Sequence, residues 1–464
     1  MRIAVVGAGP AGVRAVEQLV RAGLRPLWID EAPDGGGRIY QRPPAGFARG
    51  GRALYGLEAA KAHALHATLD ALKPATDWRP DTLVWDIGAN PRELHTLHHG
   101  QVAAHGFDAT ILCTGAMDRV IPLPGWTLPG VTTLGGAQIA LKAQGCAIGR
   151  CVAFLGSGPL LWLVAYQYMK AGATVAAVLD TTPFATKARA LAGLPHDPTT
   201  LAKGLYYVAR LRAAGILVAE GVTPLAIEGD GERGVSALRW RDAKGRERWL
   251  DCDAVGLGWG VRPEPQLADL AGVTSCFDAV QHNWVPQRDA MGRTPVRGIY
   301  LAGDAAGIGG ADVAEMAGAC AAQALLADAG LPVDAALTDR LQRRLQRQAR
   351  FRAALERAFP FPARLAAAMP DETILCRCEA VTAGELRAAA EPEGPHGVAP
   401  EVNRAKAFTR IGMGRCQGRV CGMAAAEVLA ARLGCDVAEI GRLRGQAPVK
   451  PLPLSAAPER EAAA

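Results

Sequence analysis

Four cysteines near the C-terminal end of the chain form two tight pairs. Cys376 and Cys378 are separated by one residue, Cys416 and Cys421 by four, and 37 residues lie between the pairs. Zinc-binding pairs usually have about two to four residues between them, whereas a [2Fe–2S] cluster takes two thiolates at each iron, which suits a one-residue gap. We therefore expect these four residues to ligate one [2Fe–2S] cluster. Zinc ligands or simple packing thiols are the alternative.

The residues around these cysteines match the charge of such a cluster. Two ferric ions, two sulfides and four thiolates sum to roughly −2. Three neighbouring arginines would offset this charge and tune the reduction potential: Arg377, Arg415 and Arg419. Four neighbouring glycines would let main-chain N–H groups approach the sulfurs: Gly412, Gly414, Gly418 and Gly422.

A phosphate-binding motif lies at the other end of the chain. The sequence Gly7-Ala8-Gly9-Pro10-Ala11-Gly12 follows the apolar residues 2–6 and precedes a helical pattern. Gly7 permits a tight turn, Gly9 lets a pyrophosphate approach the backbone, and Gly12 lets helix and strand pack closely. Asp30 ends the next predicted strand, where its carboxylate could hold a ribose diol, and the adjacent Glu31 could share that role. This context predicts a dinucleotide site.

A distant motif indicates which dinucleotide binds. Residues 298–304 read as a strand that ends in Gly303-Asp304, followed by a helix of small residues. Together with the first motif, it resembles the two-dinucleotide-domain flavoproteins of the thioredoxin-reductase and glutathione-reductase type. The resemblance implies FAD, with Asp304 at the flavin ribitol and the turn at Thr114 and Gly115 where the chain leaves the FAD domain.

The glycine loop 35–40 also resembles a loop that lies near the flavin in that family. Gly37 and Arg38 are its counterparts here, although the family usually carries Gln at the position of Arg38. Residues 1–330 contain no Cys-x-x-Cys pair. The dithiol chemistry of thioredoxin reductase is therefore excluded.

A second glycine motif, Gly156-Ser157-Gly158-Pro159-Leu160-Leu161, is degenerate. Leu161 replaces the third glycine and would push the helix off the strand and crowd a pyrophosphate. Asp180 still ends the next strand, but the arginines that would mark an NADPH 2′-phosphate site do not follow it. NAD, a bare adenine nucleotide such as ATP, and an empty remnant of the fold all stay open.

The cysteine module resembles the bacterioferritin-associated-ferredoxin-like (BFD-like) [2Fe–2S] domain, whose stand-alone form has only two residues between its last two cysteines. With residues 114–119, 122–131 and 409–421, it is similar to the α subunits of heteromeric, dye-linked amine dehydrogenases. These are opine, D-hydroxyproline and proline dehydrogenases and the related subunit of hydrogen cyanide synthase. The resemblance spans nearly the whole chain.

The resemblance implies an FAD-dependent oxidoreductase that acts on CH–NH groups within a hetero-oligomer. A catalytic flavoprotein β subunit would oxidise the substrate, a small ferredoxin-like γ subunit would be a further partner, and FMN would bind at a subunit interface. This chain would carry electrons through [2Fe–2S] and FAD to an external acceptor, and none of its residues would be catalytic. A self-sufficient NAD(P)H-dependent FAD/iron–sulfur reductase and a scaffold with structural nucleotides are the alternatives.

The elements that position these motifs predict an α/β protein with two glutathione-reductase-like Rossmann folds. Its expected parts are an FAD-binding domain of residues 1–118 and 259–335, a second nucleotide-binding domain of 119–258, a helical linker of 336–370, a BFD-like [2Fe–2S] domain of 371–440, and a tail of 441–464 that is mobile from 447.

The leucines of the linker at i, i+4 spacing predict an amphipathic helix with a solvated basic side; a docking surface for a partner subunit is the alternative.

Composition limits the remaining possibilities. The chain has 464 residues and a net charge of +6, without a Lys/Arg block, which argues against nucleic-acid binding. Eleven cysteines, an odd number, and no secretory signal before the first strand favour a cytoplasmic protein, membrane-free or peripherally associated. The uncharged residues 151–169 nearly reach the length of a membrane span, but the glycine turn inside them predicts a strand and a helix instead.

Overall fold

The computed structural model describes residues 1–44, 46–47, 49–89, 92–390 and 401–458. A parallel sheet carries the first glycine motif, with the strand order β20-β7-β1-β2-β3. Its strands are β1 (Ile3–Val6), β2 (Leu27–Ile29), β3 (Asp77–Arg79), β7 (Ala109–Leu112) and β20 (Ile299–Leu301). Because β20 pairs with β7 from far along the chain, this fold is assembled from two separate segments.

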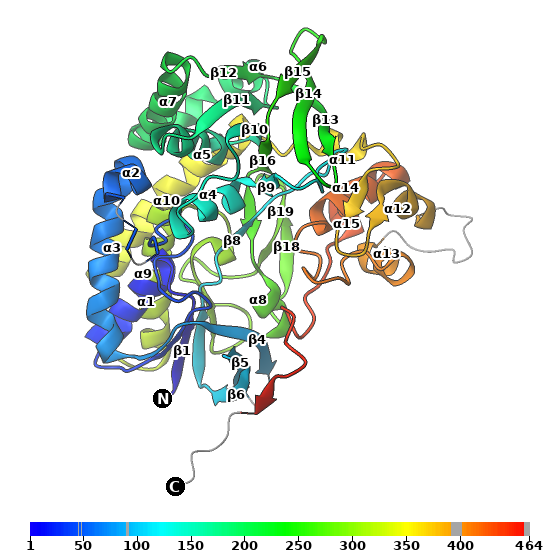
Figure 1. Ribbon diagram of the computed structural model, residues 1–464. Helices are drawn as coiled ribbons and strands as arrows, with labels where there is room; N and C mark the ends of the chain where they lie inside the picture. The colour runs from blue at the N-terminus through cyan, green and yellow to red at the C-terminus, as the bar shows by residue number, and fades with distance from the viewer. Residues whose placement is uncertain (45, 48, 90–91, 391–400, 459–464) are drawn as a thin grey trace.

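Three helices pack on this sheet in one apolar core: α1 (Pro10–Arg21), α3 (Ala59–Leu72) and α9 (Ala311–Asp328) (Figure 1). The helices α1 and α9 approach closely at Gly318. A Cβ at Gly318 would lie 2.0 Å from the Ala11 carbonyl oxygen, so only glycine permits this contact. The close packing holds the middle of α9 against the start of α1, next to the first glycine turn.

A second, antiparallel sheet beside the first receives the C-terminal tail. It consists of β4 (Thr82–Ala89), β5 (Arg92–His98) and β6 (Gln101–Gly106), and the tail strand β23 (Ala457–Pro458) pairs in parallel with β6. The expectation of a mobile tail from 447 is wrong for the residues that the structure describes. Val449 is buried, and its N–H donates to the Trp85 carbonyl at 2.9 Å. Residues 459–464 lie outside the described residues.

The second nucleotide-binding fold repeats the parallel architecture. Its strand order is β12-β11-β10-β16-β9, from β9 (Val131–Thr133), β10 (Cys151–Ser157), β11 (Thr174–Asp180), β12 (Leu217–Glu220) and β16 (Ala254–Trp259). Helices α4 (Leu134–Ala143), α5 (Pro159–Lys170), α6 (Phe184–Arg189) and α7 (Pro198–Ala213) flank it, and β13 (Thr223–Asp230), β14 (Gly234–Arg241) and β15 (Glu247–Asp251) form an antiparallel sheet. The uncharged stretch 151–169 is strand and helix, as expected. Within the described residues, no helix combines the length and the apolarity that crossing a membrane requires.

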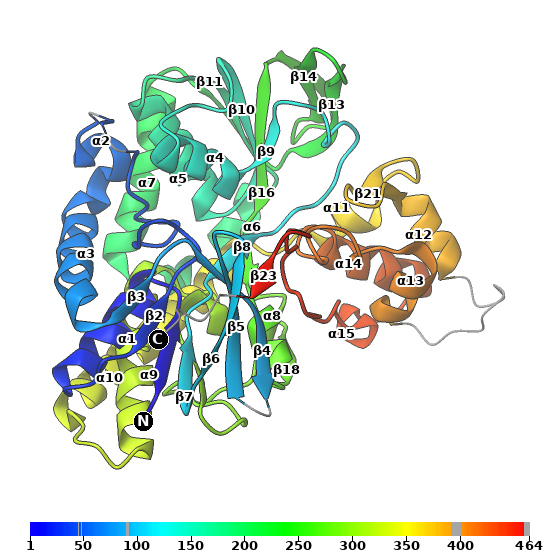
Figure 2. The same ribbon diagram turned by 60° about the horizontal axis from the view of Figure 1, so that its bottom comes forward.

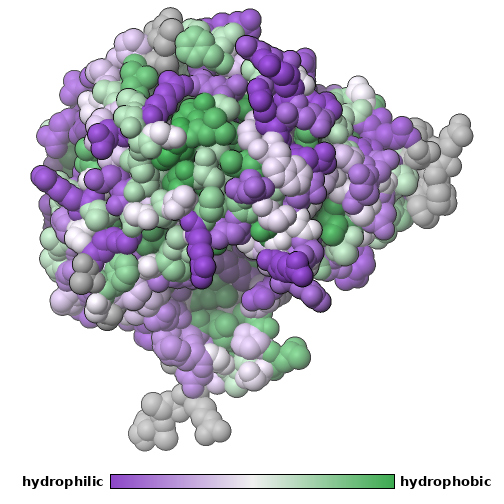
Figure 3. Space-filling model, turned by 45° about the horizontal axis from the view of Figure 1, so that its top comes forward, coloured by the Kyte–Doolittle hydropathy of each residue, from purple (hydrophilic) through white to green (hydrophobic). Residues whose placement is uncertain are grey.

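The surface of the molecule that Figure 3 shows carries hydrophobic side chains near its centre, bordered by hydrophilic ones. Several large apolar side chains of the second fold are exposed, among them Phe184, Leu205 and Trp249.

The linker helix α10 (Ala335–Ala358) packs its leucine face within the molecule. Leu341 is buried against Met316 and Cys320 of α9, with Leu337 and Leu345 beside it. Four basic residues on the other faces of this helix are exposed: Arg340, Arg343, Arg344 and Arg347. The amphipathic interpretation is therefore confirmed.

The cysteine module projects to one side of the two folds (Figure 2). It comprises α11 (Ala363–Ala367), β21 (Ile374–Cys376), β22 (Val381–Thr382), α12 (Ala383–Ala389), α13 (Val402–Thr409), α14 (Gly422–Leu433) and α15 (Val437–Ile440). The facing surface comes from β17 (Val261–Pro263), α8 (Gln266–Leu270), β18 (Ser275–Asp278) and β19 (Asn283–Pro286). Strand β8 (Ala116–Asp118) pairs with β17. The Trp126 indole N–H donates to the Ile374 carbonyl at 2.6 Å and so ties β21 to the second fold.

Candidate functional site: a flavin fold facing four cysteines

The first glycine turn is shaped by contacts that a side chain would block. A Cβ on Gly7, whose φ is +104°, would lie 2.4 Å from the Cys113 carbonyl oxygen, and one on Gly12 would lie 1.9 Å from the Gly7 oxygen. Pro10 and Ala11 then begin α1, so that the free N–H groups of the helix end face the turn. This cradle fits the pyrophosphate of a dinucleotide.

The two acidic residues after β2 have different partners. The Asp30 carboxylate accepts from the main-chain N–H of Ala8 at 2.5 Å and of Ala32 at 2.8 Å, and burial raises its pKa to about 6. Glu31 pairs with Arg38 at 3.0 Å and with Lys450 of the tail. Burial opposes ionisation of Glu31, but these two cations hold its pKa below the usual value. Asp30 therefore lies at the glycine turn, where the ribose was expected, whereas Glu31 anchors the tail.

The residues expected near the flavin come together from three segments of the chain. A Cβ on Gly37 would lie 2.9 Å from the Gly9 Cα, which puts the glycine loop against the first turn. The Asp304 carboxylate accepts from the main-chain N–H groups of Gly309 and Gly310 at 2.8 and 3.0 Å, and a Cβ on Gly303 would meet Ala11. The structure thus brings these predicted residues to one end of the first sheet.

The four cysteines meet at one end of the module. Cys376 ends β21, Cys421 precedes α14, and Cys378 and Cys416 lie in the adjoining loops. Hydrogen bonds link the thiols in the order Cys376, Cys421, Cys416 and Cys378. No three His, Cys, Asp or Glu side chains of the described residues surround one point as the ligands of a single ion would. A [2Fe–2S] cluster needs only two thiolates at each iron.

Hydrogen bonds prepare two of these thiols to ionise. The hydrogen bonds that the Cys421 thiol donates lower the pKa of Cys376 to about 6 and that of Cys416 to about 5. The same two hydrogen bonds raise the pKa of Cys421 itself. The main-chain N–H of Gly412 also faces Cys376. A Cβ on Gly414 would lie 2.4 Å from the Cys378 Cβ, which explains that glycine. Thiolates are the form that binds metal, so the donor set fits an iron–sulfur cluster.

A buried ion pair connects the loop that holds Cys416 and Cys421, here called the cysteine loop, to the turn at Thr114 and Gly115, here called the flavin turn. Arg419, between two of the cysteines, donates to the Glu264 carboxylate at 2.9 Å. The Glu264 main chain in turn donates to the Gly115 carbonyl at 3.1 Å and accepts from the Thr114 hydroxyl at 2.7 Å. Two residues before Glu264, Arg262 donates to the Arg419 carbonyl at 2.8 Å. The cluster site and the flavin turn are thus joined through one acidic residue that we did not predict.

In the second nucleotide fold, the residues expected at the nucleotide contact other side chains of the protein. Leu161 is buried in the apolar core below α5. The fully buried Asp180 carboxylate pairs with Lys187 at 2.6 Å, and Lys187 also pairs with Glu220 at 2.9 Å. The carboxylate expected at a ribose is therefore already engaged.

A buried lysine outside the motifs, Lys142 of α4, contacts the glycine loop 35–40. Its ammonium donates to the Ile39 carbonyl of the glycine loop 35–40 at 2.8 Å and lies over the Tyr55 ring. Burial lowers its pKa to about 7. Nothing in the local sequence marks it, because α4 belongs to the other fold.

Comparisons with known proteins agree with these sites. A family model described as pyridine nucleotide-disulphide oxidoreductase matches residues 1–319, and one described as BFD-like [2Fe-2S] binding domain matches residues 374–431. Both expected cofactor classes, FAD and [2Fe–2S], are thereby supported.

Relatives of similar length are subunits of multi-subunit enzymes. The chain is 36% identical to an opine oxidase subunit of Agrobacterium tumefaciens, over 97% of this chain and 90% of that protein. It is 31% identical to hydrogen cyanide synthase subunit HcnB of Pseudomonas aeruginosa, over 98% of both. In fold it is similar to L-proline dehydrogenase from P. horikoshii, with a TM-score of 0.69, 19% identity, and coverage of 98% of this chain and 78% of that one.

Proposed function

Because the chain belongs to the pyridine nucleotide-disulphide oxidoreductase family, and within it is related to an opine oxidase subunit, we propose that it is the electron-transfer subunit of a heteromeric amine or imino-acid dehydrogenase. A partner flavoprotein β subunit, with or without a small ferredoxin-like γ subunit, would oxidise the CH–NH bond of an opine, a proline or a hydroxyproline. Water would then hydrolyse the resulting imine. This chain would pass the electrons on to an external acceptor.

The observation that carries this proposal is the contact between the cysteine loop and the flavin turn. Arg419 and Glu264 connect the two sites directly. Electron transfer through protein is efficient only over short distances. A cluster module held against the flavin turn therefore suits an electron carrier better than a structural appendage.

The residues of this chain would bind and orient the two groups. When bound, FAD exchanges one or two electrons and [2Fe–2S] exchanges one at a time. Gly7, Gly9 and Gly12 would cradle the FAD pyrophosphate, and Asp30 and Asp304 would hold its ribose and ribitol. The four cysteine thiolates would hold the cluster, and the ion pair of Arg419 with Glu264 would hold the cysteine loop in place.

An NAD(P)H-dependent reductase is disfavoured by the second fold. Asp180 would have to leave Lys187 before ATP or NAD could use its carboxylate. Reduction of the flavin by NADH in the isolated chain would support that rival. An FMN at the interface with the partner subunit belongs to the proposal and is tested by extraction and identification of the flavins of the complex.

Purification of the full chain, alone and with its partner subunit, tests the proposed function. We expect iron, sulfide and FAD in the chain, and reduction of a dye by an amine substrate only when the partner is present. Full substrate–dye activity of the isolated chain would contradict the proposal.

A pair of cysteine variants controls the cluster assignment. Cys378→Ser should abolish the visible absorption of the cluster, whereas Cys435→Ser, at a thiol between α14 and α15 of the same module, should leave it unchanged. If Cys378→Ser kept the same cluster absorption as Cys435→Ser, Cys378 would not be a ligand.

A further inference from the structure

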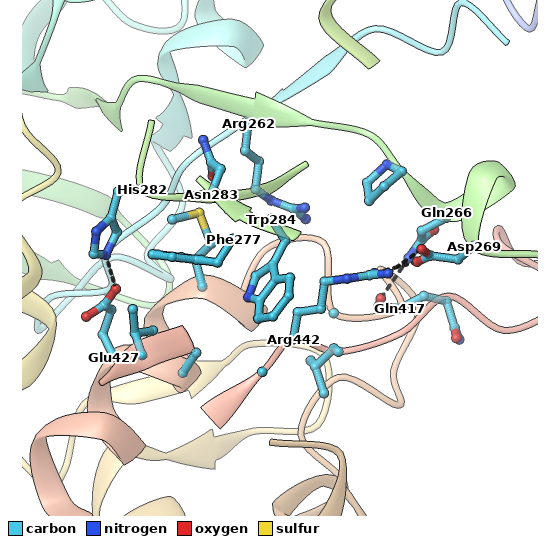
Figure 4. A pocket seen from close by; sticks show the side chains of 18 residues that line it. Arg262, Gln266, Asp269, Phe277, His282, Asn283, Trp284, Gln417, Glu427 and Arg442 are labelled. Atoms are coloured by element: carbon cyan, nitrogen blue, oxygen red, sulfur yellow. Dashed lines mark hydrogen bonds and ion pairs between the residues drawn. The ribbon is translucent and has the colours of Figure 1, made fainter. Parts of the chain in front are cut away.

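Arg262 is a cation without a carboxylate partner among the residues that the structure describes. Its side chain extends from β17 toward the cysteine module and is only partly exposed (Figure 4). Figure 4 also shows two other contacts between the module and the first fold, Arg442 with Asp269 and His282 with Glu427, each of which includes a carboxylate. The charge of Arg262 is therefore not balanced in the way that the charge of Arg442 is.

The hydrogen bonds of Arg262 hold it on the main chain of the cysteine loop. Its guanidinium donates to the Arg419 carbonyl at 2.8 Å and to its neighbour, the Pro263 carbonyl, at 3.4 Å. Arg419 lies between Cys416 and Cys421 in the sequence, and its N–H donates to the Cys416 carbonyl at 3.0 Å. The guanidinium thus contacts the segment that joins two of the expected cluster ligands.

The electrostatic surroundings of Arg262 include both cysteines of this loop. Burial lowers the pKa of Arg262, whereas the carboxylate of Glu264 and the thiolates of Cys421 and Cys416 raise it. In the sheet, Arg262 lies opposite Met117 of β8, directly beyond the flavin turn. The cation therefore lies close to the cysteine loop and to the flavin turn.

The arginines that neighbour the cysteines in the sequence are either balanced or screened. The charge of Arg419 is balanced by the Glu264 carboxylate at 2.9 Å. Arg377 and Arg415 are exposed, so that solvent and salt screen their charges. Two cations, Arg262 and Arg419, and the carboxylate of Glu264 leave one positive charge unbalanced beside the cysteine loop.

We propose that Arg262 is the counter-cation that sets the reduction potential of the cluster. The inference rests on the proposed function, because it requires a [2Fe–2S] cluster at the four cysteines. Uptake of one electron changes the charge of such a cluster from roughly −2 to roughly −3. A fixed positive charge nearby stabilises the more negative form, so Arg262 raises the reduction potential.

Redox titration of the full chain, followed by electron paramagnetic resonance of the reduced cluster, tests this role. Arg262→Gln keeps a hydrogen-bond donor for the Arg419 carbonyl and removes the charge. At a fixed applied potential, the ratio of reduced to oxidised cluster should fall about 10-fold, which corresponds to a potential lower by about 59 mV. Arg262→Lys keeps the charge in a different shape and should hold the ratio within about 3-fold of that of the unaltered chain.

Two further variants separate the effect of charge from that of a looser loop. Glu264→Gln removes the carboxylate and leaves Arg419 unbalanced, so the ratio of reduced to oxidised cluster should rise. A looser cysteine loop would instead shift the ratio in the same direction for Glu264→Gln and Arg262→Gln. Arg377→Gln is the matched control at an exposed arginine between two cluster cysteines, and it should change the ratio by about 2-fold or less.

The proposal is overturned if Arg262→Gln shifts the ratio no more than Arg377→Gln, if Arg262→Lys shifts it as much as Arg262→Gln, or if Glu264→Gln lowers it. Iron and sulfide per chain are measured in every variant, and if Arg262→Gln does not assemble the cluster, the direction of the Glu264→Gln shift decides. Absent iron and sulfide in the unaltered chain would overturn both this inference and the proposed function. Full amine–dye activity of the isolated chain would overturn the proposed function alone.

Discussion

The ion pair between Glu264 and Arg419 should hold the cysteine module on the flavin fold. The two side chains are only 14% and 9% exposed, and their charged atoms lie 2.9 Å apart. Removal of one partner from a buried pair leaves an uncompensated charge and costs about 3–5 kcal/mol. We expect Glu264→Gln to lie at the lower end of this range. Arg419→Leu should lie at the upper end, because Arg419 also donates to the Val449 and Cys416 carbonyls.

The lost free energy should weaken the docking of the cysteine module on the flavin fold more than the folding of the whole chain. Amide hydrogen exchange should therefore accelerate in residues 371–390 and 441–458, while β1 and β7 stay protected. The double variant should cost less than the sum of the two single variants, because one interaction is removed in both. Glu228→Gln is a matched control, since its pair with Arg239 is about one-third exposed and should contribute about 1 kcal/mol or less.

Denaturant unfolding and hydrogen exchange together measure these differences. Additive single variants, or a Glu264→Gln cost equal to that of Glu228→Gln, would refute the reasoning. The flavin turn and the cysteine loop would then be neighbours without energetic coupling.

Three further changes test separate parts of the structure. Gly12→Ala places a Cβ 1.9 Å from a main-chain oxygen and should abolish FAD binding, measured by bound flavin, while Gly50→Ala, with open space around it, should not. Burial lowers the pKa of Lys142 from 10.5 to about 7, so between these pH values the unfolded chain binds one proton more than the folded chain. The free energy of unfolding should therefore rise with pH across this window, by at most about 1.4 kcal/mol per pH unit. Lys142→Met should remove this slope, as measured by denaturant unfolding at two pH values. Val449→Ala should cost about 1–3 kcal/mol in unfolding experiments because it leaves a cavity under the tail, whereas Leu454→Ala, at an exposed position, should cost almost nothing.

The local motifs were predictable because their chemistry depends on residues close in sequence. The turn at Gly7, Gly9 and Gly12 is dictated by contacts within a strand–turn–helix unit. The cysteine pairs are similarly local, and the short stretch around Cys416 supplies its own glycines and arginines. Such patterns identify a dinucleotide site and a [2Fe–2S] site before any tertiary contact is known, whereas FAD follows from the family resemblance that the distant residues 298–304 carry.

The second nucleotide fold shows where local reasoning stopped. Leu161 weakened the expected site, yet the sequence left NAD, ATP and an empty fold as open choices. The ion pair of Asp180 with Lys187 arises from the folding of α6 over β11, and no spacing rule predicts it.

By itself, then, the sequence determined the two nucleotide-binding motifs, the four clustered cysteines and the order of the elements that carry them, since each depends on short-range backbone geometry and side-chain type. Only the tertiary structure decided that Glu264 joins the cysteine loop to the flavin turn and that Arg262 contacts the same loop. It likewise decided that the tail packs through Val449. These contacts join residues more than a hundred positions apart, and their partners are selected by the packing of whole domains, which no local pattern encodes.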